Sequence, residues 1–157
     1  GIGAEKNPGV TAAVQQTPGA IGYVELIYAL ANDLPAPAIK NAAGNYVTPS
    51  LESVSEAAAG FLADLPDDLR VSITNPPEGE KAYPIAGFTW ILVRGQYDDE
   101  AKARALTEFL YWALTEGDGY AEELHYAPLP DPVKELAIQK LEQVTVGGTP
   151  VFTSPAQ

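Results

Sequence analysis

The chain contains no cysteine and no methionine, and His125 is its single histidine. The absence of cysteine excludes a disulfide framework, a thiol nucleophile and a cysteine-ligated zinc site. One histidine also excludes a histidine-rich metal site. Because residue 1 is glycine and methionine is absent, we expect a processed or cut polypeptide rather than one that starts at its own initiator codon.

Long apolar runs and basic residues are also scarce. No run approaches the ~20 apolar residues that a membrane-spanning helix needs, and no signal peptide is visible, as expected if one has been removed. The net charge of −12 argues against nucleic acid or an anionic membrane surface as a partner. A small anion is not excluded, because such sites use local N–H donors and helix N-termini.

What remains is a globular composition. Of 157 residues, 46% are hydrophobic and 19% charged, which suits one ordinary domain or two small lobes. The sequence pattern predicts several helices. They are a helix from Asn7, as N-cap before Pro8, to about Gln16; a short one over residues 26–30; one capped by Ser50 and reaching residue 65; one over residues 98–115; a short one over residues 120–124; and a last one opened by Asp131 and Pro132.

The predicted β segments are shorter. We expect a buried strand at residues 21–24, a hairpin joining residues 37–41 to 45–48, a strand at 69–74, and a strongly apolar buried strand at 85–93. Residues 75–81 contain two prolines and a glycine, and they are predicted to form a linker or an exposed loop near the only lobe boundary. Residues 126–130 should be irregular. The tail from Gly147 has few packing residues, although Val151 and Phe152 are candidates for an edge strand.

Nothing in the sequence predicts an enzyme, a metal site or a cofactor. His125 has no cysteine partner, no G-x-S-x-G elbow surrounds any serine, and a loop or packing role is the preferred interpretation of this histidine. No third glycine follows Gly1 and Gly3 at dinucleotide-loop spacing. The acidic clusters at residues 67–68, 98–100 and 122–123 are read as solvated helix ends.

One weak candidate for a binding feature precedes the first helix. Residues 3–9 form an entrance rich in backbone N–H groups, beside Lys6, that could face an anion. The candidate residues are Gly3, Lys6 and Asn7. An ordinary N-capped helix is the simpler interpretation of the same pattern.

Three motifs together carry a family resemblance. They are QTPGAIGYVE at residues 16–25, AYPIAGFTW at residues 82–90 and YAPLP at residues 126–130. In this order they resemble the C-terminal half of the phosphate-binding proteins of ABC phosphate transporters. The resemblance implies an α/β fold of the type II periplasmic-binding-protein class, with mixed sheets flanked by helices and parts of two lobes.

The resemblance carries further implications for organisation and function. Residues 1–81 would be the C-terminal part of the second lobe, and residues 82–157 the hinge crossover and the C-terminal part of the first, with Tyr83 and Pro84 at the hinge. The implied function is capture of inorganic phosphate outside the cytoplasmic membrane, in the periplasm or lipid-anchored at the bacterial cell surface, and its delivery to ABC permease subunits.

The sequence departs from the family at the anion site. The family's arginine and Ser-Gly-Thr loop would fall before Gly1, and no Ser-Gly-Thr occurs in the chain. We therefore transfer no phosphate ligand to Arg70, Arg94 or Arg104. Uncovered sheet edges should favour association, so we expect a companion, either the missing N-terminal half or copies of the chain itself. The alternative is a self-assembling or structural extracellular fragment without solute binding.

Overall fold

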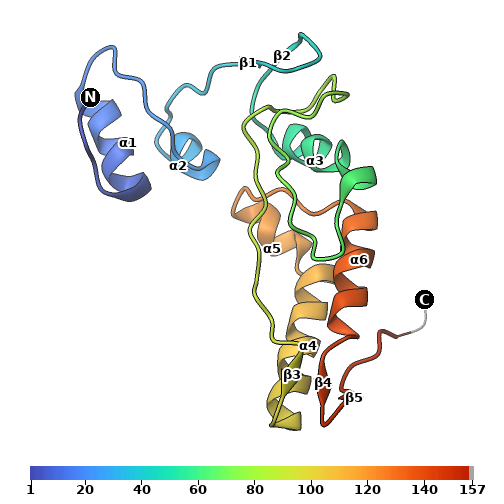
Figure 1. Cartoon of the computed structure of the whole chain (residues 1–157). Helices are drawn as coiled ribbons and strands as arrows, with labels where there is room; N and C mark the ends of the chain where they lie inside the picture. Colours follow the sequence, from blue (N-terminus) through green and yellow to red (C-terminus); the bar gives the residue numbers. More distant parts are fainter. Residues whose placement is uncertain (156–157) are drawn as a thin grey trace.

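The computed structural model describes residues 1–155, apart from the side chain of Asp64. It combines helices with two small sheets, one of them mixed, and this agrees with the predicted α/β class. Figure 1 shows two parts: a pair of helices at the N-terminus, and a longer body built around two side-by-side helices. The elements are α1 (Lys6–Gln16), α2 (Leu26–Ala31), β1 (Ile39–Lys40), β2 (Tyr46–Val47), α3 (Leu51–Ala59), η1 (Leu62–Asp64), β3 (Gln96–Tyr97), α4 (Glu100–Thr115), α5 (Asp118–Glu123), α6 (Asp131–Leu141), β4 (Thr145–Val146) and β5 (Thr149–Pro150).

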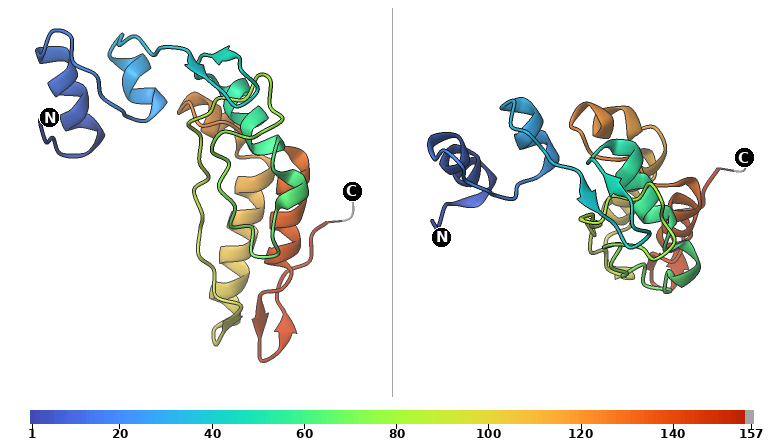
Figure 2. Two further views of the ribbon diagram at one scale, coloured as in Figure 1. Left: turned by 45° about the horizontal axis from the view of Figure 1, so that its top comes forward. Right: turned by 90° about the horizontal axis from the view of Figure 1, so that it is seen from above.

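The N-terminal helix pair, α1 with α2, packs on itself. The segment between the two helices crosses α1 at Gly22, where an added Cβ would lie 2.7 Å from Val14 and 2.9 Å from Val10. Glycine is therefore required for this close approach. In Figures 1 and 2 a single run of chain connects this pair to the rest of the molecule.

The start of α1 differs from the prediction. The N-cap is Glu5, which makes no side-chain cap bond, and Lys6 has a φ of 54°. Asn7, the expected cap, instead accepts a hydrogen bond from the Glu25 N–H through Oδ1 at 3.3 Å. A backbone N–H distant in the sequence thus forms a hydrogen bond with the side chain that was predicted to cap the helix.

The sequence predicted the β1–β2 hairpin and the start of α3 correctly. β1 and β2 form the expected antiparallel hairpin, with Ile39 opposite Val47. Ser50 caps α3 in a capping box with Ser53. However, α3 ends at Ala59 rather than near residue 65, and Gly60 follows it. A Cβ at Gly60 would lie 2.9 Å from the ring of Pro76, so the loop at residue 76 packs where the predicted helix would continue.

Residues 75–81 form the predicted loop, and five of them are exposed: Asn75, Pro77, Glu78, Glu80 and Lys81. Pro76 and Gly79 are buried, and the loop is held by the buried side chain of Asn41. Asn41 Nδ2 donates to the carbonyls of Gly79, Glu80 and Ala82 at 2.8, 3.0 and 3.2 Å, and its Oδ1 accepts from the Asn45 N–H at 3.0 Å. The proline-rich composition reflects turns in a packed loop rather than a flexible connection.

The apolar core lies between α4, α6 and the C-terminal tail. Asp99 caps α4 through the Lys102 N–H, and the helix buries Ala103, Thr107 and Leu110. The sequence pattern predicts Ala105, Phe109 and Trp112 on one apolar face, with Leu106, Leu110 and Ala113 beside it. Of these, Leu110 is buried, whereas Phe109 remains 60% exposed and Ala105 is exposed. Thr107 is fully buried because its hydroxyl donates to the Ala103 carbonyl at 3.0 Å.

The tail packs more than its composition indicated. Val151 and Phe152 are buried, though neither lies in a strand, and the ring of Phe152 lies 5.3 Å from that of Tyr111. Before them β4 and β5 form a tight hairpin, and β4 also pairs in parallel with β3. Gly147 and Gly148 have φ values of 58° and 83°, as a two-residue hairpin turn requires.

Three of the predicted strands are absent from the described residues. No strand hydrogen bonds are formed by residues 21–24, 69–74 or 85–93. Far from being buried, Ile21 is 98% exposed and Leu92 is 92% exposed. Figure 1 shows the run after residue 84 descending beside α5 and α4 without a neighbouring strand. A segment with an alternating or apolar sequence does not form a strand when no neighbouring strand supplies its backbone hydrogen bonds.

Replacing Asn41 with alanine should destabilise the fold by about 2–3 kcal/mol, because it leaves buried loop carbonyls without their donor. The free energy of unfolding can be measured by urea denaturation. Asn45→Ala is the matched control, since the exposed side chain of Asn45 donates a single hydrogen bond, to the Glu80 carbonyl at 3.2 Å. Equal losses for the two variants would show that Asn41 does not organise the loop.

Candidate functional site

The predicted helix entrance is exposed rather than gathered around a recess. Gly3 has open space where a Cβ would lie, and Lys6 is exposed in a left-handed conformation. The Asn7 amide oxygen is directed at the Glu25 backbone. The structure thus joins Asn7 to the exit of the residue 21–24 segment, and an anion-facing role for Gly3, Lys6 and Asn7 stays a prediction.

The predicted hinge residues mark the point where the chain leaves the packed loop. The Tyr83 N–H donates to the Ser53 carbonyl at 2.9 Å, and the Pro84 carbonyl accepts from the Asn75 N–H at 3.0 Å. Pro84 is buried, and desolvation raises the pKa of the half-buried Tyr83. Both residues are therefore anchored beside α3, and the unpaired run begins immediately after them.

A long-range hydrogen bond was not foreseen from the sequence. The Tyr126 hydroxyl donates to Glu25 Oε2 at 2.9 Å, joining residues 101 positions apart. Glu25 is the last residue of one family motif and Tyr126 is the first residue of another. Membership in these motifs is the only feature of the sequence that marked the two residues. The bond to Glu25 raises the pKa of Tyr126, with smaller contributions from burial and from the negative charge of Glu25.

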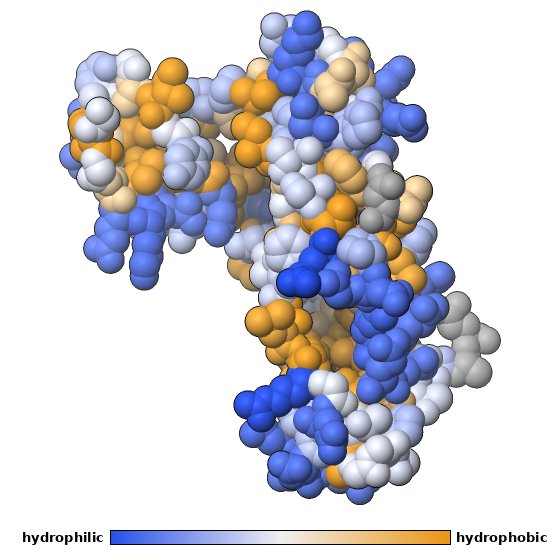
Figure 3. All heavy atoms as spheres, viewed as in Figure 1, coloured by the Kyte–Doolittle hydropathy of each residue, from blue (hydrophilic) through white to orange (hydrophobic). Residues whose placement is uncertain are grey.

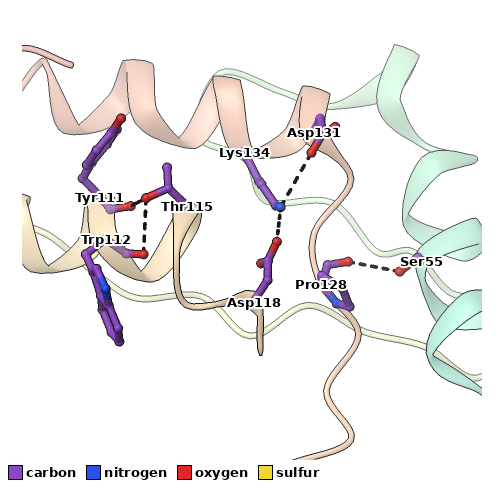
Figure 4. A network of polar contacts seen from close by, with 8 residues as sticks. All are labelled: Ser55, Tyr111, Trp112, Thr115, Asp118, Pro128, Asp131 and Lys134. Atoms are coloured by element: carbon purple, nitrogen blue, oxygen red, sulfur yellow. Dashed lines mark hydrogen bonds and ion pairs between the residues drawn. The ribbon is translucent and has the colours of Figure 1, made fainter. Parts of the chain in front are cut away.

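A polar recess lies between α3, α5 and α6. Figure 4 shows Lys134 of α6 in ion pairs with Asp118 and with Asp131, the latter at 3.6 Å. Nearby, Ser55 of α3 donates to the Pro128 carbonyl at 3.0 Å. The recess has a volume of about 400 Å³, and its walls include Glu52 and Glu56. Its lysine is already paired and its lining is acidic, which suits a structural junction better than an anion site.

A second, larger recess is apolar. The apolar groove has a volume of about 690 Å³, and its walls are residues 65–70 in part, residues 88–95, and the facing sides of α4 and α6. Figure 3 shows apolar atoms exposed in a hollow on the lower half of the molecule, with hydrophilic atoms above and below. Such a surface suits packing against another apolar segment rather than holding a hydrated ion.

No catalytic or metal-binding arrangement occurs within residues 1–155. His125 is exposed, and no described side chain forms a hydrogen bond with its ring. The same residues contain no group of three or more histidine, aspartate or glutamate side chains placed to hold a metal ion. Within them, no helix combines the length and apolar character needed to cross a membrane.

Glu25→Gln should lower the pKa of Tyr126, because it removes the charged acceptor that favours the protonated phenol. A raised tyrosine pKa adds stability that is fully present below the ordinary value of 10.0 and is lost as the pH rises through the folded-state pKa. NMR titration of ring-labelled tyrosine measures the change. Tyr83 is the internal control, because burial raises its pKa and Glu25 does not; an unmoved Tyr126 would contradict the assigned cause.

Comparison with known proteins places these features in a family. The chain is similar to three proteins named phosphate-binding protein PstS. The protein from Xylella fastidiosa (strain 9a5c) is 45% identical over 130 residues, covering 83% of this chain and 35% of that protein. Those from Methanocaldococcus jannaschii and Pasteurella multocida are 34% and 36% identical, covering 92% and 90% of this chain and 40% of each relative.

The chain therefore spans well under half the length of these relatives. A family model described as the PBP superfamily domain matches residues 1–116. That match includes the N-terminal helix pair, the β1–β2 hairpin, the packed loop and α4. The α/β architecture with small mixed sheets agrees with it, and the chain belongs to the PBP superfamily.

Proposed function

We propose that this chain is part of an extracytoplasmic receptor that captures inorganic phosphate and delivers it to an ABC importer. The observation that carries the proposal is the similarity, at 34–45% identity, to proteins named for phosphate binding. The receptor acts in the periplasm or lipid-anchored at the cell surface, and it meets ABC permease subunits there. Since the relatives bear binding-protein names, a non-enzymatic role accords with the absence of a catalytic cluster in the sequence.

The lobes and hinge belong to the same proposal. Residues 1–81 form part of one lobe, and residues 82–157 contain the crossover and part of the other. Tyr83 and Pro84 are the hinge crossing, a placement supported by their position where the anchored loop gives way to the extended run. A hinge of this kind needs only a few residues that absorb the backbone rotation.

The receptor is completed by a companion segment. Support comes from the unpaired apolar run at residues 85–93, from the exposed Ile21 and Tyr23, and from the apolar groove. The companion corresponds to the part of the relatives that this chain does not match, rather than to copies of the chain. A net charge of −12 on every copy opposes self-association.

Most of the phosphate ligands lie on that companion. The family's arginine and Ser-Gly-Thr loop do not occur in this chain. From this chain the entrance of α1 contributes Gly3, Lys6 and Asn7 as the anion-facing edge. Lys6 is exposed at the start of an 11-residue helix, where the helix dipole favours negative charge.

The test uses the unmatched part of the Xylella fastidiosa relative as companion, co-expressed with this chain. We expect a 1:1 complex by native mass spectrometry and phosphate binding by calorimetry, whereas the chain alone should bind no phosphate. In the complex, Lys6→Ala should weaken phosphate binding about tenfold, which corresponds to about 1.4 kcal/mol. Lys40→Ala is the matched control, because Lys40 is exposed on the β1–β2 hairpin.

Two results would contradict the proposal. A 1:1 complex that gives no heat with phosphate would remove the receptor function. Assembly of this chain with itself, in place of the companion, would remove the proposed partner and favour a structural role.

A further inference from the structure

The N-terminal helix pair is internally cohesive. Besides the close packing at Gly22, Gln15 Nε2 donates to Asn32 Oδ1 at 3.4 Å, and Asn7 accepts from the Glu25 N–H. Glu25 is the N-cap residue of α2, so its backbone is fixed both to its own helix and to the start of α1. These contacts hold the two helices together, and Glu25 lies where the start of α1 meets the start of α2.

The connection between this pair and the body is thin. Among the described residues, the only hydrogen bond or ion pair between residues 1–34 and residues 35–155 is the one from Tyr126 to Glu25. The covalent link passes through Pro35, Ala36 and Pro37, all exposed. Figure 2 shows the pair standing away from the body in both views.

Tyr126, in contrast, belongs to a supported segment of the body. Its N–H donates to the Ala121 carbonyl of α5 at 2.9 Å. Two residues later the Pro128 carbonyl accepts from Ser55 of α3 at 3.0 Å. The ion pair of Lys134 with Asp118 joins α5 to α6 close by. The backbone around the phenol is therefore hydrogen-bonded to α5 and α3, and the bond from Tyr126 to Glu25 joins this segment to the N-terminal helix pair.

We propose that the Glu25–Tyr126 hydrogen bond is a reversible latch that fixes the orientation of the N-terminal helix pair on the body. The bond is directional and charge-assisted, so it selects one orientation. It is also exposed to water, which competes for both groups and lets the bond open. When it opens, the pair turns on the link at residues 35–37. This inference is independent of phosphate and of the proposed receptor function.

Because the chain lacks cysteine, two labelling sites can be introduced cleanly. Gln16→Cys on α1 and Gln139→Cys on α6 are both exposed positions. With spin labels at these sites, electron–electron double resonance should give a narrow distance distribution for the parent chain. Tyr126→Phe should broaden the distribution, since the hydroxyl donor is lost while the ring remains. Glu25→Ala should broaden it equally.

The double variant and two controls test the pairing itself. Combining Tyr126→Phe with Glu25→Ala should add no further broadening, whereas Glu25→Gln, which keeps an acceptor oxygen, should stay close to the parent. Tyr23→Phe is the matched control, because Tyr23 is 93% exposed and its hydroxyl forms no hydrogen bond within residues 1–155. Circular dichroism confirms that each variant keeps its helices.

Three outcomes would overturn the latch. The first is a broad distribution in the parent, the second is a narrow one in Tyr126→Phe, and the third is additive broadening in the double variant. All measurements are made without phosphate. A complex with the companion that gives no heat with phosphate, together with the expected broadening in the variants, would therefore contradict the receptor function and leave the latch standing.

Discussion

An extended apolar segment is stable as a strand only when a neighbour supplies its backbone hydrogen bonds and covers its side chains. In this chain that requirement is unmet at residues 85–93, where no backbone N–H finds an acceptor among the described residues. Two features of the surface follow from this. The groove beside α4 and α6 stays open, and Ile91 and Leu92 face outward. The proposed companion segment would cover this exposed apolar surface.

The packed body is stabilised by contacts within the chain itself. α4 and α6 bury Ala103, Leu110 and Leu141 against Val144, Val151 and Phe152, while Asn41 holds the loop from which the extended run departs. This body holds both the segment of Tyr126 and the proposed hinge residues Tyr83 and Pro84 through hydrogen bonds to the backbone. Within residues 1–155, the N-terminal helix pair is joined to this body by one hydrogen bond and by the proline-containing link.

The sequence predicts the local features well and the non-local ones poorly. The cap at Ser50 and the hairpin at Ile39 and Val47 depend on residues a few positions apart, and both were predicted. The predicted strands at residues 21–24 and 85–93 need partners that periodicity cannot supply. The buried face of α4 was misjudged because α6 and the tail, not the pattern itself, decide which side is covered. The Glu25–Tyr126 contact joins distant segments, and only the family resemblance marked both of them.

Backbone hydrogen exchange tests the central claim, that residues 85–93 await a partner strand, most directly. In the isolated, dilute chain these amides should exchange as fast as in an unstructured peptide, while the buried turns of α4 around Ala103 and Leu110 remain protected. Addition of the unmatched part of a PstS relative should protect residues 85–93 strongly. Strong protection of these amides in the isolated monomer would contradict the account, because it would show that the chain already satisfies the segment by itself.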